Sequence, residues 1–322
     1  MSRTIVGILR GGPSSEYDFS LKSGAAILKT LPEDSYDTRD IFIDKTGLWH
    51  SRGMPADPVR ALSQVDVIFN ALHGGAGEDG TVQRILERVG VAYTGPGPEA
   101  AFQSFNKIRA REIFEEAGLV IPQGVSLTIS DGTTGEMARF VFERFGPPYV
   151  VKPPTDGSSH NIRYVTSIIE LPDAIGDILD LYGSALVEEF LDGEDASVGI
   201  MEDFRGQDIY AFPPSHIISP KNSRHIERSH YVDNSLQHIV PSNFTHAEKD
   251  LLIDMARKAH IALNLEHFSK ADFVLTRRGP YLLEVDSIPT LHESSALSHM
   301  LESVGASVGE LGQHVLSLAQ SR

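Results

Sequence analysis

Two apolar runs near the C-terminal end constrain the fold of this chain most strongly. They cover residues 273–275 and 281–285, and an Arg-Arg-Gly-Pro sequence at 277–280 lies between them. Glycine and proline between two such runs are typical of a tight turn, so the segment is predicted to form a β-hairpin. Side chains on a hairpin alternate between two faces, which fixes where its polar residues point.

Three acidic side chains are predicted to share one face of this hairpin. Residues i and i+2 of a strand point the same way, so Glu284 and Asp286 lie together. The turn folds Asp272 back beside them. Three converging carboxylates repel one another unless a cation lies between them, and oxygen-only ligands suit Mg²⁺. The alternative is an acidic, solvated strand edge, which is a common feature of sheets.

The composition excludes several classes of protein. The chain has 322 residues, no cysteine and a net charge of −16, so disulfides, thiolate zinc sites and a cysteine nucleophile are ruled out. A general binder of nucleic acid or of an anionic membrane would be basic. No stretch approaches the roughly 18 apolar residues of a membrane span. We therefore expect a cytoplasmic protein of two or three domains with neither nucleic-acid nor membrane partners.

The N-terminal third alternates strands, glycine-rich turns and helices. A strand over residues 4–9 leads through one such turn to a helix over 20–31, and a strand over 65–72 leads through another to a helix over 81–89. These units predict an α/β domain with a parallel sheet, which binds ligands at the carboxyl edge of its strands. The dinucleotide fingerprint G-x-G-x-x-G is absent, so the turns give little support to a nicotinamide cofactor.

Two side chains in these turns are candidate site residues. Glu16 ends the first turn, where a carboxylate either binds a substrate cation or complements the dipole of the helix that follows. His73 begins the second turn, among glycines that let a ligand approach the backbone. Catalytic and structural roles for His73 are equally open.

Two lysines in the central part are candidate phosphate ligands. Lys107 lies in the first turn of a helix predicted over residues 106–117, where a cation is unfavourable unless an anion lies nearby. Lys152 ends a buried strand over 149–152, and the loop that follows at 153–160 is rich in Pro, Gly and Ser, whose N–H and hydroxyl groups can wrap phosphate. This loop is not a P-loop, because G-x-x-x-x-G-K-[ST] is missing. The alternatives are a solvated lysine and an ordinary hairpin loop.

A long polar segment interrupts the C-terminal part of the chain. Residues 220–234 are rich in histidine and basic side chains and have no periodicity. Long loops in compact domains are often lids, so we expect this one to close over a ligand. The remaining predicted elements are strands at 184–190 and 196–212 and helices at 245–263, 298–304 and 306–319, the first of which starts with a Thr245–Glu248 capping box.

Six motifs, taken in order along nearly the whole chain, resemble those of the D-alanine–D-alanine ligase family. This family belongs to the ATP-grasp superfamily, which holds ATP between two α+β lobes behind an N-terminal α/β domain. The motifs are Glu16 with Ser20-Leu21-Lys22-Ser23-Gly24, His73-Gly74 with Gly77-Glu78-Asp79-Gly80, Tyr93-Thr94-Gly95, Lys107, Val151-Lys152-Pro153 with Gly157-Ser158-Ser159, and Asp272 with Glu284-x-Asp286.

The resemblance implies three domains and a nucleotide site. The domains would be an N-terminal α/β substrate domain over residues 1–102, a central ATP-grasp lobe over 103–183, and a C-terminal lobe with the metal and substrate site over 184–322. Lys107 and Lys152 would bind the ATP phosphates, and Ser158 and Ser159 would lie on the loop that closes over them. Glu188, with the backbone of Phe190 and Leu191, would bind adenine. Asp195 would take the place of a ribose-binding glutamate.

The resemblance also implies metal and substrate residues. Asp272, Glu284 and Asp286 would bind two Mg²⁺, for which Mn²⁺ can substitute. The catalytic residues would be Glu16, His73, Ser159 and Lys270. Glu16 would receive the amino group of the first substrate, with His73 beside it, and Lys270 falls where the family has an arginine that stabilises the tetrahedral intermediate. Thr290 and Ser295 would lie at the second substrate.

Departures from the family pattern concentrate near the second substrate. Lys270 lacks the bidentate geometry of the family's arginine. Asp286 stands in place of a metal-binding asparagine and adds a negative charge, and Thr290 replaces a glycine. The family's lid motif is not recognisable in residues 220–234.

The chemistry that the family performs suits these residue types. ATP converts a carboxylate into an acyl phosphate, and the oxyanion formed when an amine attacks needs fixed positive charge. Metal ions and lysines neutralise the transferring phosphoryl group. We therefore expect a ligase that joins two D-amino acids for peptidoglycan biosynthesis, as a monomer or a homodimer. The alternatives are a ligase with a different acceptor, such as a hydroxy acid, and a nucleotide-binding homologue without ligase activity.

Overall fold

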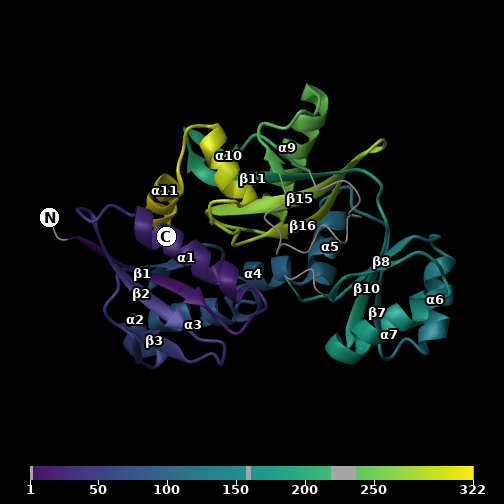
Figure 1. The fold of residues 1–322 in the computed structure, drawn as a ribbon, viewed down its shortest axis with the longest axis horizontal. Helices are drawn as coiled ribbons and strands as arrows, with labels where there is room; N and C mark the ends of the chain where they lie inside the picture. The colour runs from purple at the N-terminus through teal and green to yellow at the C-terminus, as the bar shows by residue number, and fades with distance from the viewer. Residues whose placement is uncertain (1–2, 157–160, 219–236, 322) are drawn as a thin grey trace.

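The computed structural model describes residues 3–156, 161–218 and 237–321. These residues form three sheets with helices packed against them. Figure 1 shows the N-terminal sheet at one end of the molecule, the central sheet at the other, and the C-terminal sheet between and above them. No helix in the described ranges is long and apolar enough to cross a membrane.

The N-terminal sheet confirms the predicted α/β domain. Its strands are β1 (Thr4–Gly11), β2 (Tyr36–Ile43), β3 (Trp49–Ser51), β4 (Met54–Pro55), β5 (Val67–Asn70) and β6 (Ala92–Tyr93). They lie in the order β4-β3-β2-β1-β5-β6, and β1, β2, β5 and β6 pair in parallel. The antiparallel β3 and β4 were not predicted, because strands of three and two residues are too short to show a period.

Helices cover both faces of this sheet. The side chains of Ile8 and Phe69 belong to a core shared with α1 (Tyr17–Thr30) and α11 (Val308–Ser321), and Ile68 belongs to the opposite core, under α2 (Pro58–Leu62) and α3 (Thr81–Val89). The C-terminal helix therefore returns to the N-terminal domain, and Figure 1 shows it beside α1.

The central sheet is antiparallel and has the order β7-β10-β8-β9. Its strands are β7 (Gly124–Thr128), β8 (Tyr149–Lys152), β9 (Arg163–Val165) and β10 (Ser184–Glu189), and α6 (Thr134–Phe142) and α7 (Leu171–Tyr182) pack on it. Helix α7 was not predicted, although its buried residues Leu171, Ile175, Ile178 and Leu179 have helical spacing.

The C-terminal sheet contains the predicted hairpin. Its order is β14-β13-β11-β15-β16, with β12 beside β11. The strands are β11 (Glu194–Phe204), β12 (Gln207–Ala211), β13 (Ser215–Ile218), β14 (Gln237–Ile239), β15 (Phe268–Thr276) and β16 (Gly279–Asp286), and the helices are α9 (His246–Ala262) and α10 (Ala296–Ser303). The Thr245–Glu248 capping box at the start of α9 is confirmed.

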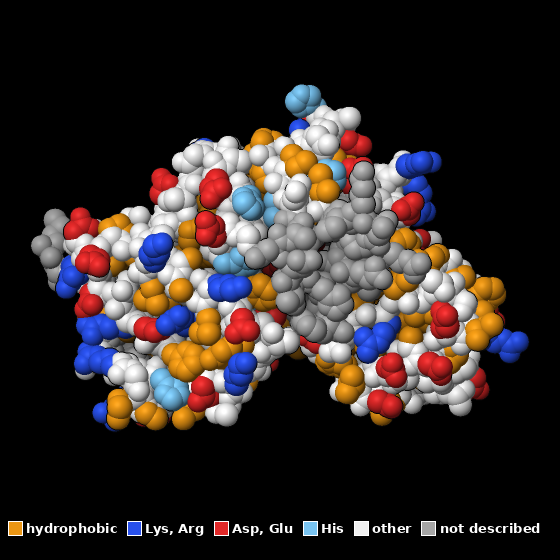
Figure 2. Space-filling model, in the orientation of Figure 1, with side chains coloured by type: hydrophobic (Ala, Val, Ile, Leu, Met, Phe, Trp, Pro, Cys, Tyr) orange, Lys and Arg blue, Asp and Glu red, His pale blue; other side chains and the backbone are white. Residues whose placement is uncertain are grey.

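Two helices, α4 (Pro98–Phe105) and α5 (Lys107–Glu116), connect the N-terminal domain to the rest. The expected boundary at residue 102 falls inside α4, and the one at 183/184 falls just before β10, which pairs with the central sheet. We propose a division that follows packing, with β10 in the central lobe and α11 on the N-terminal sheet. Figure 2 shows a notch on the lower edge between the N-terminal domain and the central lobe.

Candidate active site

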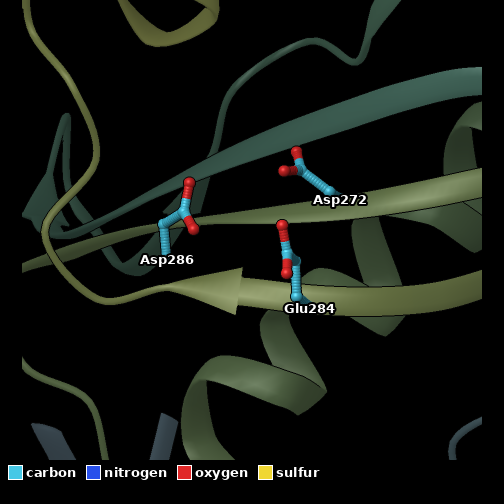
Figure 3. A group of neighbouring side chains, drawn as sticks. All are labelled: Asp272, Glu284 and Asp286. Atoms are coloured by element: carbon cyan, nitrogen blue, oxygen red, sulfur yellow. The ribbon is translucent and has the colours of Figure 1, made fainter. Parts of the chain in front are cut away.

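The hairpin of β15 and β16 brings the three predicted carboxylates together. In its antiparallel register Asp272 lies opposite Glu284, and Lys270 lies opposite Asp286. One ligand oxygen from each of the three acids lies within 4.8 Å of the others. Figure 3 shows the three side chains standing on the same side of the hairpin. The predicted convergence is therefore confirmed, and the acids are partly buried rather than spread along a solvated edge.

Two lysines neutralise part of this cluster. Lys107 donates from Nζ to Glu284 Oε2 at 2.9 Å, and the Lys270 Nζ lies 2.6 Å from Asp272 Oδ2 and 2.9 Å from Asp286 Oδ2. The two lysine side chains are only 12% and 9% exposed. Lys107 thus has the nearby anion that its place at a helix N-terminus requires, and the alternative of a solvated lysine is wrong.

Burial and pairing separate the pKa values of the two facing acids. Burial raises the pKa of Asp272 to about 6, against the opposing effect of Lys270 beside it. Burial acts in the same direction on Glu284, but the positive charges of Lys107 and Lys152 outweigh it and lower the pKa of Glu284 to about 2. At neutral pH both acids are therefore mainly charged, but Glu284 stays charged down to a much lower pH than Asp272.

Lys152, at the end of β8, faces Glu188 of β10. The Lys152 Nζ lies 2.5 Å from Glu188 Oε2, and Arg111 donates from Nη1 to Glu188 Oε1 at 2.6 Å. All three residues are buried. Lys152 and Glu188 were predicted to bind a nucleotide, whereas Arg111 was not predicted to take part. Its signal was the spacing of four residues from Lys107, which places both on one side of α5.

Glu16 precedes α1 without capping it. Its side chain makes no capping hydrogen bond and lines a pocket together with the carboxylate cluster. Burial, and then the negative charges of Asp286 and Glu284, raise the pKa of Glu16 to about 7. Buried Glu78 lies nearby and accepts a hydrogen bond from the Gly74 N–H at 2.7 Å, and burial raises its pKa well above the usual range. A cation in the pocket would strongly stabilise the charged form of such desolvated acids.

His73 connects two parts of the chain that are distant in sequence. Its Nε2 lies 2.8 Å from Ser23 Oγ, which accepts the Leu291 N–H at 3.0 Å. A hydrogen bond to the Ile288 backbone engages the imidazole as well, and burial lowers the pKa of His73 to about 4. His73 is therefore neutral near pH 7 and ties the turn after β5 to α1 and to the loop after β16. Ser23 belongs to the Ser20–Gly24 motif, but its hydrogen bond with the Leu291 N–H could not be predicted from the sequence.

Many of these groups line one pocket of about 90 Å³. The pocket brings together Glu16, His73, Lys107 and Lys270 with the three acids and Thr290. Phe19, Phe105 and His292 also line it and were not predicted. Ser295 is not among the lining residues, because it is buried and its hydroxyl accepts the Ser298 N–H at 3.3 Å as the N-cap of α10.

The other predicted nucleotide residues follow β10. The rings of Phe190 and Tyr164 pack edge-on, with their centroids 5.0 Å apart. The backbone N–H of Phe190 donates to the Pro148 carbonyl at 3.0 Å. Leu191 is buried, and Asp195 lies on β11. The predicted residues Ser158 and Ser159, and the loop at 220–234, lie outside the described residues.

The donor set fits a hard divalent cation and phosphate. Carboxylate oxygens that converge within 4.8 Å are the ligands that Mg²⁺ and Mn²⁺ prefer. Lysines beside them offer the point charges that bind phosphoryl oxygens. The side chains around the pocket are therefore of the types that suit a divalent cation, a phosphate and an ammonium group.

Comparison with known proteins agrees with this geometry. The family model for the C-terminus of D-ala D-ala ligase matches residues 113–317, and the model for its N-terminus matches residues 52–96. The D-alanine–D-alanine ligase of Geobacter sulfurreducens is 35% identical over 99% of this chain and 95% of that protein. That of Desulforudis audaxviator is 30% identical over 98% of this chain and 99% of its own length.

Solved structures show the same architecture. D-alanyl-alanine synthetase A from Vibrio cholerae superposes with a TM-score of 0.89 at 26% identity, over the whole of both chains. The VanG D-Ala:D-Ser ligase from Enterococcus faecalis superposes with a TM-score of 0.85 over 99% of this chain and 100% of that chain, and at 22% identity it supports the fold alone. The fold is ATP-grasp, behind the predicted N-terminal α/β domain. The chain belongs to the D-alanine–D-alanine ligase family of ATP-dependent ligases.

Proposed function

We propose that this protein joins two D-amino acids at the expense of ATP, through an acyl phosphate of the first. The observation that carries the proposal is the single pocket in which Glu16, the Asp272–Glu284–Asp286 cluster and Lys107 meet. A ligase of this kind must hold an ammonium, a metal-bound polyphosphate and a reacting carboxylate within a few ångströms.

The nucleotide would lie between the central and C-terminal sheets. Lys107 and Lys152, which pair with Glu284 and Glu188 in the structure, would neutralise its phosphates. The end of β10 around Glu188, with Leu191 after it, would hold its base. Mg²⁺ at the carboxylate cluster is the natural metal and Mn²⁺ its substitute, and the resemblance implies two ions there. When bound, ATP and metal supply the phosphoryl group and part of the charge stabilisation.

The first substrate would lie against Glu16. A carboxylate whose pKa is raised to about 7 by burial and by neighbouring acids is stabilised in its charged form by a substrate ammonium. His73 keeps the surrounding loops in place through Ser23. The ammonium of Lys270, which also lines the pocket, would provide fixed positive charge for the developing oxyanion.

The residues that differ from the family pattern lie near the second substrate, so the choice of this substrate is where the function would differ. Thr290 lines the pocket where the family has a glycine, and its larger side chain leaves less space in the pocket. A ligase with a different acceptor, such as a hydroxy acid or another amino acid, is therefore the second candidate function. For either acceptor the reaction requires ATP, so we expect it in the cytoplasm, and a homodimer remains a prediction.

ADP release over a matrix of D-amino acids, L-amino acids and D-lactate tests the proposal. We expect Mg²⁺-dependent ADP release with D-amino acid donors, matched by product detected by mass spectrometry. Glu284→Gln serves as the control that should abolish both signals. Tight ATP binding without ADP release for any pair would contradict ligation and favour a nucleotide-binding homologue.

A further inference from the structure

Lys270 occupies a position inside the carboxylate cluster. Its Nζ lies 2.6 Å from Asp272 Oδ2 and 2.9 Å from Asp286 Oδ2, so one ammonium contacts two of the three acids. These are the short distances of charge-assisted hydrogen bonds. An ammonium in this place does for the two acids what a bound metal ion would do for them.

The register of the hairpin holds the lysine there. Lys270 and Asp272 are two residues apart on β15 and share a face, and they lie directly opposite Asp286 and Glu284 on β16. On its other side β15 pairs with β11, where Gly199 faces Lys270. Directly opposed side chains in an antiparallel pair have Cβ atoms only about 5 Å apart. The backbone therefore keeps the Cβ of Lys270 on the same face as Asp272 and directly across from Asp286, within reach of both acids.

Burial favours the same arrangement. The Lys270 side chain is 9% exposed, so an ammonium that left Asp272 and Asp286 would lose its partners without gaining full hydration. The carboxylates still have free acceptor capacity for a metal ion. Asp272 also accepts a hydrogen bond from Ser197 at 2.6 Å, and each carboxylate oxygen keeps a second lone pair for a metal ion.

We propose that Lys270 is a built-in cation that takes the place of one metal ion, so that the loaded site holds a single divalent ion between Asp272 and Glu284. Asp286 is then a partner of the lysine rather than a metal ligand. The charges agree with this assignment, because Lys107 and Lys270 reduce the formal charge of the three acids from −3 to −1. The inference rests on the proposed ATP-dependent function and revises the ion number that the resemblance implies.

Counting Mn²⁺ ions by electron paramagnetic resonance tests this directly. The full-length protein is saturated with the non-hydrolysable analogue adenylyl imidodiphosphate and titrated with Mn²⁺. We expect one tightly bound ion per nucleotide complex in the wild type and two in Lys270→Gln, which frees Asp286. Lys258→Gln removes an exposed lysine of α9 and should leave the count at one.

A second pair of variants keeps the test independent of how well Lys270→Gln folds. Asp286→Asn should leave Mn²⁺ affinity within a few-fold of wild type, whereas Glu284→Gln should weaken it by roughly 10-fold or more, because a metal-site carboxylate is lost. Two ions in the wild type, or equal weakening by both variants, would overturn the inference. Calorimetric titration with the nucleotide alone separates the two proposals, since absence of nucleotide binding would reject the proposed function itself.

Discussion

Replacing Glu16 with glutamine is expected to stabilise the ligand-free protein while weakening substrate binding. Glu16 is held in a largely desolvated pocket beside Asp286 and Glu284, which raises its pKa from the ordinary 4.5 to about 7. Between these pH values the folded protein keeps a proton that the unfolded chain has released. The stability that this proton provides is complete below pH 4.5 and is lost as the pH rises through about 7.

The size of the effect follows from the pKa difference. Each pKa unit corresponds to about 1.4 kcal/mol, which sets an upper limit of about 3 kcal/mol for the free energy of unfolding lost above pH 7. Glu16 is partly exposed, so solvent screens the interaction and we expect about 1–3 kcal/mol. Glutamine has the shape of protonated glutamate and does not titrate. Glu16→Gln should therefore match the wild type at pH 4.5 and exceed its stability at pH 8.

Urea unfolding from pH 4.5 to 8.5, with EDTA present to exclude divalent ions, measures this difference. Glu116→Gln removes an exposed carboxylate at the end of α5 and serves as the matched control, with a profile parallel to wild type. In the same variant of Glu16 the KM of the first substrate should rise about 10-fold, because a charge-assisted hydrogen bond to an ammonium is lost. Parallel wild-type and Glu16→Gln profiles would refute the reasoning, and an unchanged KM would remove Glu16 from the substrate site.

Two further predictions concern buried contacts around the pocket. Lys152→Ala should weaken ATP binding more than adenosine binding in calorimetric titrations, because a phosphate contact is lost. Equal weakening of both ligands would mean that Lys152 has only a structural role, through its ion pair with Glu188. Ser23→Ala should lower the free energy of unfolding by about 1–3 kcal/mol in urea titrations, because it leaves the Leu291 N–H and the His73 ring without their partner. Ser126→Ala, at an exposed position of β7, should change it by less than about 0.5 kcal/mol, and equal stability of the two variants would contradict the role given to Ser23.

Sequence patterns predicted the parts of the fold that have a strong period or an explicit turn. The acidic hairpin is such a case, because the period of two in a strand places Glu284 and Asp286 on one face and the turn returns Asp272 to them. The capping box of Thr245 and Glu248 likewise marked the start of α9. Short strands such as β4 carry no such signal, and the place of α11 depends on long-range packing.

The site was predicted as a set of residue types but not as a set of contacts. The motifs could place Lys107 and Lys270 near phosphate and substrate, but not their ion pairs. Lys107 pairs with Glu284, which is distant in the sequence. The pairing of Lys270 with Asp272 and Asp286 depends on the strand register. The same holds for Arg111, which bonds Glu188 across 77 positions. Ser295 shows the opposite case, because its hydroxyl caps α10 and is not among the groups that line the pocket.

The fate of the donor carboxylate oxygen tests the central claim most directly. The first D-amino acid is labelled with ¹⁸O in its carboxylate and incubated with unlabelled ATP, Mg²⁺ and the acceptor. If the carboxylate attacks the γ-phosphate and the acyl phosphate is then cleaved by the acceptor, one labelled oxygen must leave with phosphate. We expect ADP, product and singly ¹⁸O-labelled inorganic phosphate in equal amounts by mass spectrometry. Product formed with unlabelled phosphate, or with the label in AMP, would contradict the acyl-phosphate route.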